Sequence, residues 1–297
     1  MKNFLYINND FKGLILMLMG QLSFSINDAI VKYSVKLSSN DFTTLNIIFI
    51  RGIFTSVLIF FIMIFFTKIN ISKIFINKKF YLRGIFEVLT AIFFFAGLIL
   101  MPMANVYTLL MTAPFIITLY AAIFLKEKVG IRRWSAVIIG FIGVIIVINP
   151  QNLQFGFLFA LPLIAAIFLT MRDVFTKGFV NKNNILEINL VTSILIMFSS
   201  GLGAIIFNIK IDFSYIFYIF ISSLFLTIAY ICSVLTIFYA PLSLTAAIRY
   251  TVIVFGIITG FLILGEVPSY NMIIGALIIT ASGLFVIKRQ RDLGKIY

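Results

Sequence analysis

Six side chains that could bind a ligand or carry a proton lie inside long apolar segments of this sequence. An arginine in such a place can bind a carboxylate or a phosphate through two parallel hydrogen bonds, and a tyrosine can stack on a flat ring while its hydroxyl donates. The sequence has no histidine and a single cysteine, Cys232, so the commonest general base and an intrachain disulfide are both excluded. The candidate pathway residues are Asp28, Arg51, Glu87, Tyr107, Arg249 and Tyr250.

Two interpretations of Arg51 stay open at this stage. Its position predicts a depth of roughly 10 Å below the outer surface, at 1.5 Å per helical residue. There it could bind an anionic group of a ligand. Alternatively, it forms a structural ion pair with Asp28, in the outer half of the preceding apolar segment, or extends toward the surface.

Glu87 is the only carboxylate that the sequence places deep within an apolar segment. Arg83 lies four residues earlier on the same helix face and is a ready structural partner. Arg249, at a similar depth in a later segment, is the alternative partner. Without histidine, a coupling proton would need a buried carboxylate such as Glu87.

The remaining candidates divide into pathway and helix-end residues. Arg249 and Tyr250 begin the last hairpin of the second half, and a charge at that depth is too costly for packing alone. Glu127 and Glu266 lie at helix ends, so we expect them to anchor loops or cap helices rather than touch a ligand.

The composition predicts an all-α integral membrane protein with ten transmembrane helices. Hydrophobic residues make up 62% of the 297 residues and charged residues 11%, against about half and about a quarter in soluble proteins. A spanning helix needs roughly 20 apolar residues, and helices satisfy their own backbone hydrogen bonds in lipid. The predicted spans are 12–33, 44–66, 81–101, 104–125, 134–149, 155–172, 187–207, 214–238, 243–264 and 270–287.

The distribution of basic residues predicts the orientation. With the N-terminus inside, 18 of the 23 Lys and Arg fall in inside segments, Arg172 among them, and three fall outside. This asymmetry follows the positive-inside rule and predicts that the N- and C-termini are both cytoplasmic. The net charge of +13 therefore reflects orientation, and we expect no nucleic-acid partner.

The chain also contains an internal repeat. One pair of residues, a proline and a glutamate, recurs at an offset of 139 residues. A second pair, an aspartate and a lysine, recurs at an offset of 145. Five spans per half would turn the second copy upside down relative to the first. We therefore predict an inverted 5+5 repeat, with residues 1–150 and 151–297 as the two units. The matching residues are Pro102 and Glu127 with Pro241 and Glu266, and Asp28 and Lys32 with Asp173 and Lys177.

Together these features resemble the EamA family, the ten-helix branch of the drug/metabolite transporter superfamily. The stretches that carry the resemblance include Leu82-Arg-Gly-Ile-Phe-Glu87, Phe124-Leu-Lys-Glu-Lys-Val129 and Leu264-Gly-Glu-Val-Pro268. Ser25 to Tyr33 and Arg249-Tyr250 are similar to S-adenosylmethionine uptake carriers, although Ala247-Ile248 stands where those carriers have proline.

The resemblance implies a secondary transporter with a central pocket between its halves. The expected partners are a small polar or zwitterionic metabolite, membrane lipid and either a proton or a counter-substrate, with a monomer or homodimer as the working unit. S-adenosylmethionine uptake and the export of amino acids or drugs both stay open. We expect no cofactor and no metal. A membrane enzyme or a channel is a more distant alternative, because the sequence shows neither a catalytic cluster nor a filter segment.

Overall fold

The computed structural model describes residues 9–37, 43–66, 74, 76–124, 126, 130–148, 156–209, 215–275, 277–278, 281–282 and 285. All regular elements within these ranges are helices. Seven helical stretches in the described residues, some of which join two consecutive elements, are long and apolar enough to cross a membrane. The predicted span 270–287 lies partly outside the described residues, so ten spans and the inverted repeat stay predictions.

The helices of the first half begin and end where local chemistry requires. Asn77 caps α4, because its side-chain oxygen accepts from the backbone nitrogen of Lys79 at 3.1 Å. The same helix stops at Met101, which is extended because Pro102 follows it. The elements are α1 (Asn9–Leu37), α2 (Thr43–Phe66), α4 (Lys78–Leu100), α5 (Met103–Leu110), α6 (Ala113–Ile123) and α7 (Ile131–Ile148).

The second half follows similar rules. α10 stops at Ala240, which is extended before Pro241, and α12 stops at Gly265, whose φ of 69° is left-handed. The elements are η2 (Gly156–Phe159), α8 (Ala160–Lys177), α9 (Ile185–Ile206), α10 (Ile216–Tyr239), α11 (Leu242–Arg249) and α12 (Thr251–Leu264).

One predicted boundary is wrong. The sequence ended the sixth span at residue 172 and placed Arg172 in an inside loop. The structure continues α8 to Lys177, and Arg172 is a buried helical residue. The helix can contain it because neighbouring carboxylates neutralise its charge.

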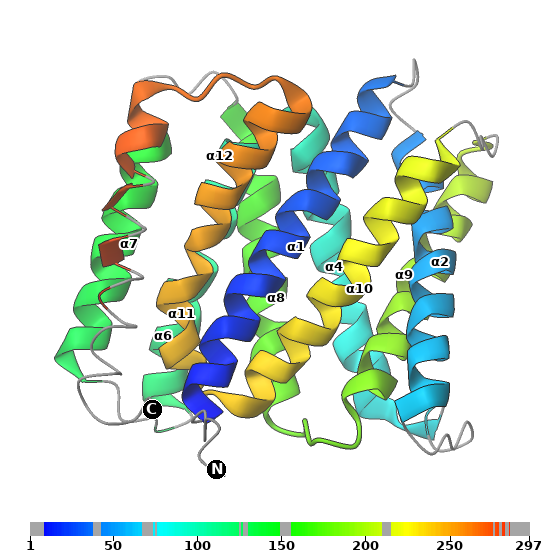
Figure 1. Cartoon of the computed structure of the whole chain (residues 1–297), viewed down its shortest axis with the longest axis horizontal. Helices are drawn as coiled ribbons and strands as arrows, with labels where there is room; N and C mark the ends of the chain where they lie inside the picture. The colour runs from blue at the N-terminus through cyan, green and yellow to red at the C-terminus, as the bar shows by residue number, and fades with distance from the viewer. Residues whose placement is uncertain are drawn as a thin grey trace, which may run out of the picture.

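The main helix pairs each combine an element of the first half with one of the second. α1 packs along α10, α2 along α9 and α4 along α8 (Figure 1). Glycines allow close approach at these crossings. An added Cβ at Gly13 would lie 2.4 Å from the Ala240 Cβ, and one at Gly52 would lie 2.8 Å from the Met197 Cβ. The two halves therefore interlock around a common centre.

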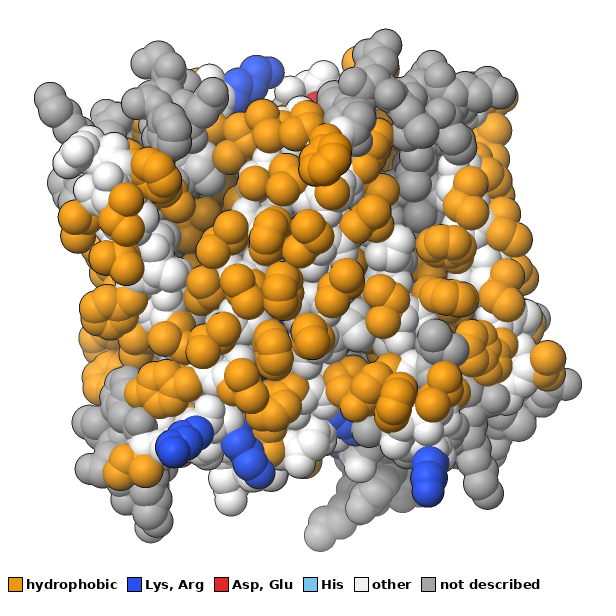
Figure 2. All heavy atoms as spheres, turned by 180° about the vertical axis from the view of Figure 1, so that it is seen from behind, with side chains coloured by type: hydrophobic (Ala, Val, Ile, Leu, Met, Phe, Trp, Pro, Cys, Tyr) orange, Lys and Arg blue, Asp and Glu red, His pale blue; other side chains and the backbone are white. Residues whose placement is uncertain are grey.

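The outer surface is that of a multi-pass membrane protein. Figure 2 shows a broad belt of hydrophobic side chains, with Lys and Arg gathered at the two ends. Soluble monomers rarely expose contiguous apolar surface of this extent. Exposed Lys78, Lys79 and Lys182 lie at the end where α4 and α9 begin, and exposed Lys36 lies at the opposite end, where α1 finishes.

Candidate functional site

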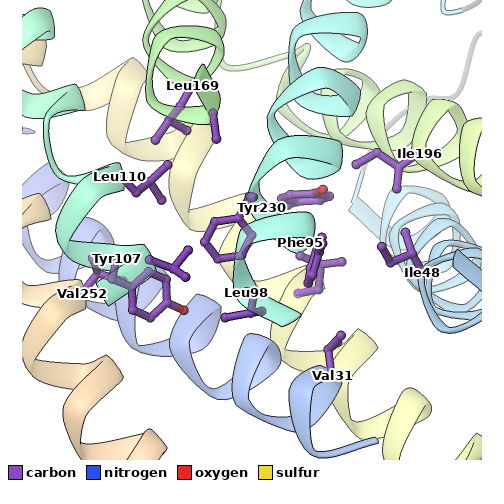
Figure 3. Packing of buried hydrophobic residues seen from close by; sticks show 14 of the residues in the cluster. Val31, Ile48, Phe95, Leu98, Tyr107, Leu110, Leu169, Ile196, Tyr230 and Val252 are labelled. Atoms are coloured by element: carbon purple, nitrogen blue, oxygen red, sulfur yellow. The ribbon is translucent and has the colours of Figure 1, made fainter. Parts of the chain in front are cut away.

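A cavity of about 100 Å³ lies where the two halves meet, and charged and aromatic side chains line it. Part of its wall is aromatic, and Figure 3 shows Tyr107, Tyr230 and Phe95 converging from α5, α10 and α4. Tyr107 stacks on Phe94, with ring centroids 5.8 Å apart. The cavity therefore offers flat apolar surfaces beside its charged groups.

Four charged residues form one buried network, which we call the Asp173 cluster: Glu87, Arg172, Asp173 and Arg249. Arg172 lies at its centre and contacts Glu87 at 2.5 Å and Asp173 at 2.7 Å. Arg249 contacts the other oxygen of Asp173 at 2.5 Å. Two positive and two negative charges thus neutralise one another across α4, α8 and α11. Because burial makes an unpaired charge very costly, each member holds the others in place.

The partner expected for Glu87 was wrong. The sequence pointed to Arg83 or Arg249, whereas the structure gives this position to Arg172. Arg83 is completely buried and donates instead to the Thr192 hydroxyl on α9. Glu87 is also not the only deeply buried carboxylate, since Asp28 and Asp173 are buried within α1 and α8.

Beside α1, four polar residues line the cavity and a fifth, Ser222, contacts one of them. We call this group the Asn27 bridge: Asn27, Asp28, Arg51, Tyr107 and Ser222. The Asn27 amide nitrogen donates to Asp28 at 2.7 Å, and its oxygen accepts from Arg51 Nη1 at 3.2 Å. The Ser222 hydroxyl donates to the same oxygen at 2.7 Å. Tyr107 donates to the other Asp28 oxygen at 2.7 Å. Asp28 and Arg51 are thus joined through an amide rather than by a direct salt bridge, within the described part of the chain.

Five of the six candidates from the sequence line this cavity: Asp28, Arg51, Glu87, Tyr107 and Arg249. Tyr250 does not. It is completely buried, and its hydroxyl donates to the backbone oxygen of Val137 at 3.3 Å. Its ring fills the space beside Gly140 on α7. The geometry therefore gives Tyr250 a packing position.

Sequence reasoning missed several polar residues of the site, among them Asn27, Arg172, Asp173 and Tyr230. For Arg172 and Asp173 a signal was present, because Val174 and Phe175 continue the apolar pattern and Asp173 recurs in the internal repeat. Asn27 and Tyr230 carry no comparable signal, since isolated amides and tyrosines are common on packed helix faces. Their importance depends on the partners that the fold brings to them.

Two lysines join helices at opposite ends of the molecule. Lys32 on α1 donates to the Met101 carbonyl at 2.9 Å and pairs with Glu266 at 2.8 Å. Lys177 on α8 donates to the Ala240 carbonyl at 2.9 Å. Both carbonyls belong to the residue that precedes a proline between two helices. Glu266 thus holds a helix end in place, and it is not among the residues that line the cavity.

Residues 11–149 match the EamA-like transporter family. The resemblance found in the sequence is therefore confirmed. A riboflavin transporter of Rhizobium johnstonii is 25% identical over 203 residues, which cover 66% of this chain and 65% of that protein. An S-adenosylmethionine uptake transporter of Rickettsia prowazekii is 25% identical over 198 residues, which cover 66% of each chain. The chain thus aligns with slightly less than two thirds of the length of these curated relatives.

A further curated relative and one solved structure are also similar to this chain. A riboflavin transporter of Vibrio cholerae is 39% identical over 69 residues, 23% of each chain. One solved structure, described only as the crystal structure of a protein, matches with a TM-score of 0.73 and 15% identity, over 94% of this chain and 98% of that one. It supports the fold alone. The EamA-like family and the curated relatives are transporters rather than enzymes.

Proposed function

We propose that this protein is a secondary transporter that moves a small polar or zwitterionic metabolite across a bacterial inner membrane. The observation that carries the proposal is the cavity between the two interlocked halves, which is lined by charged and aromatic side chains. Buried ionisable groups are expensive in a membrane protein, and they mark substrate pathways. The transporter relatives support the same class of function.

The proposed mechanism is alternating access between residues 1–150 and 151–297, arranged as an inverted repeat of ten helices. The two lysine contacts support the repeat. Lys32 and Lys177 match at an offset of 145, and their acceptors Met101 and Ala240 match at the offset of 139 that also relates Pro102 to Pro241. Equivalent contacts at opposite ends are what two inverted copies would produce.

S-adenosylmethionine uptake is the first candidate for the substrate, because both the sequence resemblance and a group of relatives point to it. Riboflavin is the second candidate, favoured by the relatives of that name and by the flat surfaces of Phe24, Phe94 and Tyr230. Both molecules contain a flat heteroaromatic ring that these side chains can stack on.

Uptake into liposomes that contain the purified protein tests the proposal. A carrier gives saturable uptake of one labelled substrate, and unlabelled substrate on the far side accelerates exchange. Uptake that never saturates would indicate a channel instead. Failure of every small-molecule substrate to enter protein-containing liposomes faster than protein-free ones would overturn the proposed function.

A further inference from the structure

Two charges that line the cavity take part in no ion pair with any described residue: Asp28 and Arg51. The other charged lining residues, Glu87, Arg172 and Arg249, belong to the Asp173 cluster and are neutralised there. Asp28 is 5% exposed and Arg51 is 2% exposed. Water therefore has little access to either side chain in this conformation.

Asn27 keeps these opposite charges apart. Its amide nitrogen donates to Asp28 and its amide oxygen accepts from Arg51, so each charge meets a neutral dipole instead of the other charge. Ser222 donates to the same amide oxygen and fixes the orientation of the amide. An ion pair between Asp28 and Arg51 would satisfy both groups, yet the fold holds an amide between them. Each charge consequently keeps binding capacity for another ion.

Arg51 in particular has hydrogen-bond donors that its neighbours do not satisfy. Its Nε atom has no hydrogen-bond partner among the described residues, and its Nη1 atom makes one bond of 3.2 Å to an uncharged amide. Its guanidinium lies over the Phe95 ring, 4.8 Å from the centroid, which holds the group in place. A guanidinium held in this way is suited to a carboxylate, whose two oxygens can accept from parallel N–H groups.

We propose that the substrate is a zwitterion whose carboxylate binds Arg51 and whose cationic centre binds beside Asp28, with its ring or apolar part against the aromatic wall. This inference rests on the proposed transport function and narrows its substrate class. A zwitterion neutralises both unpaired charges at once, and each would otherwise be costly to bury. A neutral ligand such as riboflavin leaves both of them unpaired.

The amino-acid end of S-adenosylmethionine has this chemistry, and so do free amino acids with aromatic side chains. The shared recognition element is therefore the ammonium–carboxylate pair. Phe24, Phe94 and Tyr230 would contact the remainder of either molecule. Asn27 would act as the positioning residue that sets the distance between the two charged groups.

Equilibrium binding to the purified protein tests this inference separately from transport. The ligands are S-adenosylmethionine, phenylalanine and tryptophan, each with its decarboxylated and deaminated form, together with riboflavin. At least one of the zwitterions should bind wild-type protein about tenfold or more tightly than both of its truncated forms, which corresponds to about 1.4 kcal/mol. The inference is overturned if riboflavin or a truncated form binds as tightly as every zwitterion.

Two variants that each remove one charge test which side chain binds the carboxylate and which binds the cationic group of the ligand. Arg51→Gln should abolish the preference for the zwitterion over its decarboxylated form, while the affinity for the decarboxylated form stays the same. Asp28→Asn should abolish the preference over the deaminated form in the same way. Lys36→Gln removes an exposed charge at the end of α1 and serves as the matched control. Equal weakening of all three forms by both variants would reveal a purely structural role and contradict the inference.

The same preparations distinguish this inference from the proposed function. Zwitterion binding with this pattern but no uptake into liposomes would overturn the transport function and leave the binding site intact. Saturable uptake of riboflavin without any preference for zwitterions would leave the transport function intact and overturn the binding site. The wild-type ligand series does not depend on the folding of any variant, so it decides the question even if Arg51→Gln proves unstable.

Discussion

At the scale of single residues, the buried acids of this protein differ in what neutralises them. Glu87 and Asp173 contact arginines directly, whereas Asp28, within the described ranges, accepts only from an amide and a tyrosine hydroxyl. Glu266 pairs with Lys32 at a partly exposed end, where the two side chains are 29% and 18% exposed. Water and salt screen the charges of that pair, whereas the charges of the buried Asp173 cluster are screened much less.

Glu87→Gln and Glu266→Gln should therefore differ in their effect on stability. Glu87→Gln leaves Arg172 and Arg249 sharing one carboxylate in a buried place, and we expect a loss of about 3 kcal/mol in the free energy of unfolding. Glu266→Gln removes a partly solvated pair and should cost about 1 kcal/mol or less. Denaturant unfolding of the two purified variants in the same detergent measures both values. Equal losses would show that the Asp173 cluster contributes no more than the outer pair.

Removing the hydroxyl group from each of the two predicted tyrosines distinguishes their roles. Tyr107→Phe keeps the ring on Phe94 but removes the donor to Asp28, so substrate binding should weaken about fivefold, in line with the loss of ~1 kcal/mol for one hydrogen bond. Tyr250→Phe removes a 3.3 Å bond to a backbone oxygen outside the cavity and should leave affinity within about twofold. Titration of the liposome transport rate against substrate concentration measures both. A larger loss of affinity in Tyr250→Phe than in Tyr107→Phe would show that Tyr250 contributes to substrate binding.

Sequence reasoning finds some of these residues better than others, for a physical reason. A charge in an apolar segment is recognisable without its partner, because the cost of burying it is a local property; Asp28, Arg51, Glu87 and Arg249 were found in this way. The partner of each charge depends on which helices meet. Arg172, for example, reaches Glu87 only because α8 packs along α4. Periodicity within one helix contains no such information.

At the scale of helices, hydropathy locates the apolar segments well and their ends less well. The α8 boundary was wrong because Arg172 and Asp173 lower the local hydropathy, although an ion pair between them and their neighbours removes much of the cost of burial. The segment 104–125 was predicted as one helix, whereas the structure divides it into α5 and α6 at Met111 and Thr112. Pro114, in the first turn of α6, has no backbone N–H and favours such a break.

The crossing of α2 and α9 depends on the absence of a side chain at Gly52. In Gly52→Ala, the new Cβ would lie 2.8 Å from the Cβ and 2.9 Å from the Cα of Met197, so the helices would have to separate. We expect a loss of about 1–3 kcal/mol in the free energy of unfolding, as for other overpacked sites. Gly130→Ala is the matched control, because no atom of the described residues lies within 4 Å of its added Cβ. Thermal unfolding in detergent compares the two, and equal melting temperatures would contradict the close packing of α2 on α9.

At the scale of the whole molecule, the two lysine contacts need not be equal in strength. Lys32 meets both a carbonyl and the Glu266 carboxylate, and it joins α1 to the segment after α12. Lys177 meets the carbonyls of Ile237 and Ala240 at the junction of α10 and α11. If the two halves exchange conformations during transport, each contact lies where one end of the cavity must open. The difference between them would then bias which end opens more readily.

The topology itself can be measured with one cysteine at each end. The inverted repeat predicts that the residues before α7 and those after α12 lie on opposite sides of the membrane, and Gly130 and Ser269 are exposed at these places. In right-side-out vesicles of a Cys232→Ser background, a membrane-impermeant maleimide should label Ser269→Cys directly. It should label Gly130→Cys only after permeabilisation, since the basic residues place that end inside. Labelling of both from one side would eliminate the inverted repeat, because five spans in each half cannot return both segments to the same face. Labelling with the two sides exchanged would keep the repeat and reverse the orientation, and the basic residues would then need an explanation other than membrane insertion.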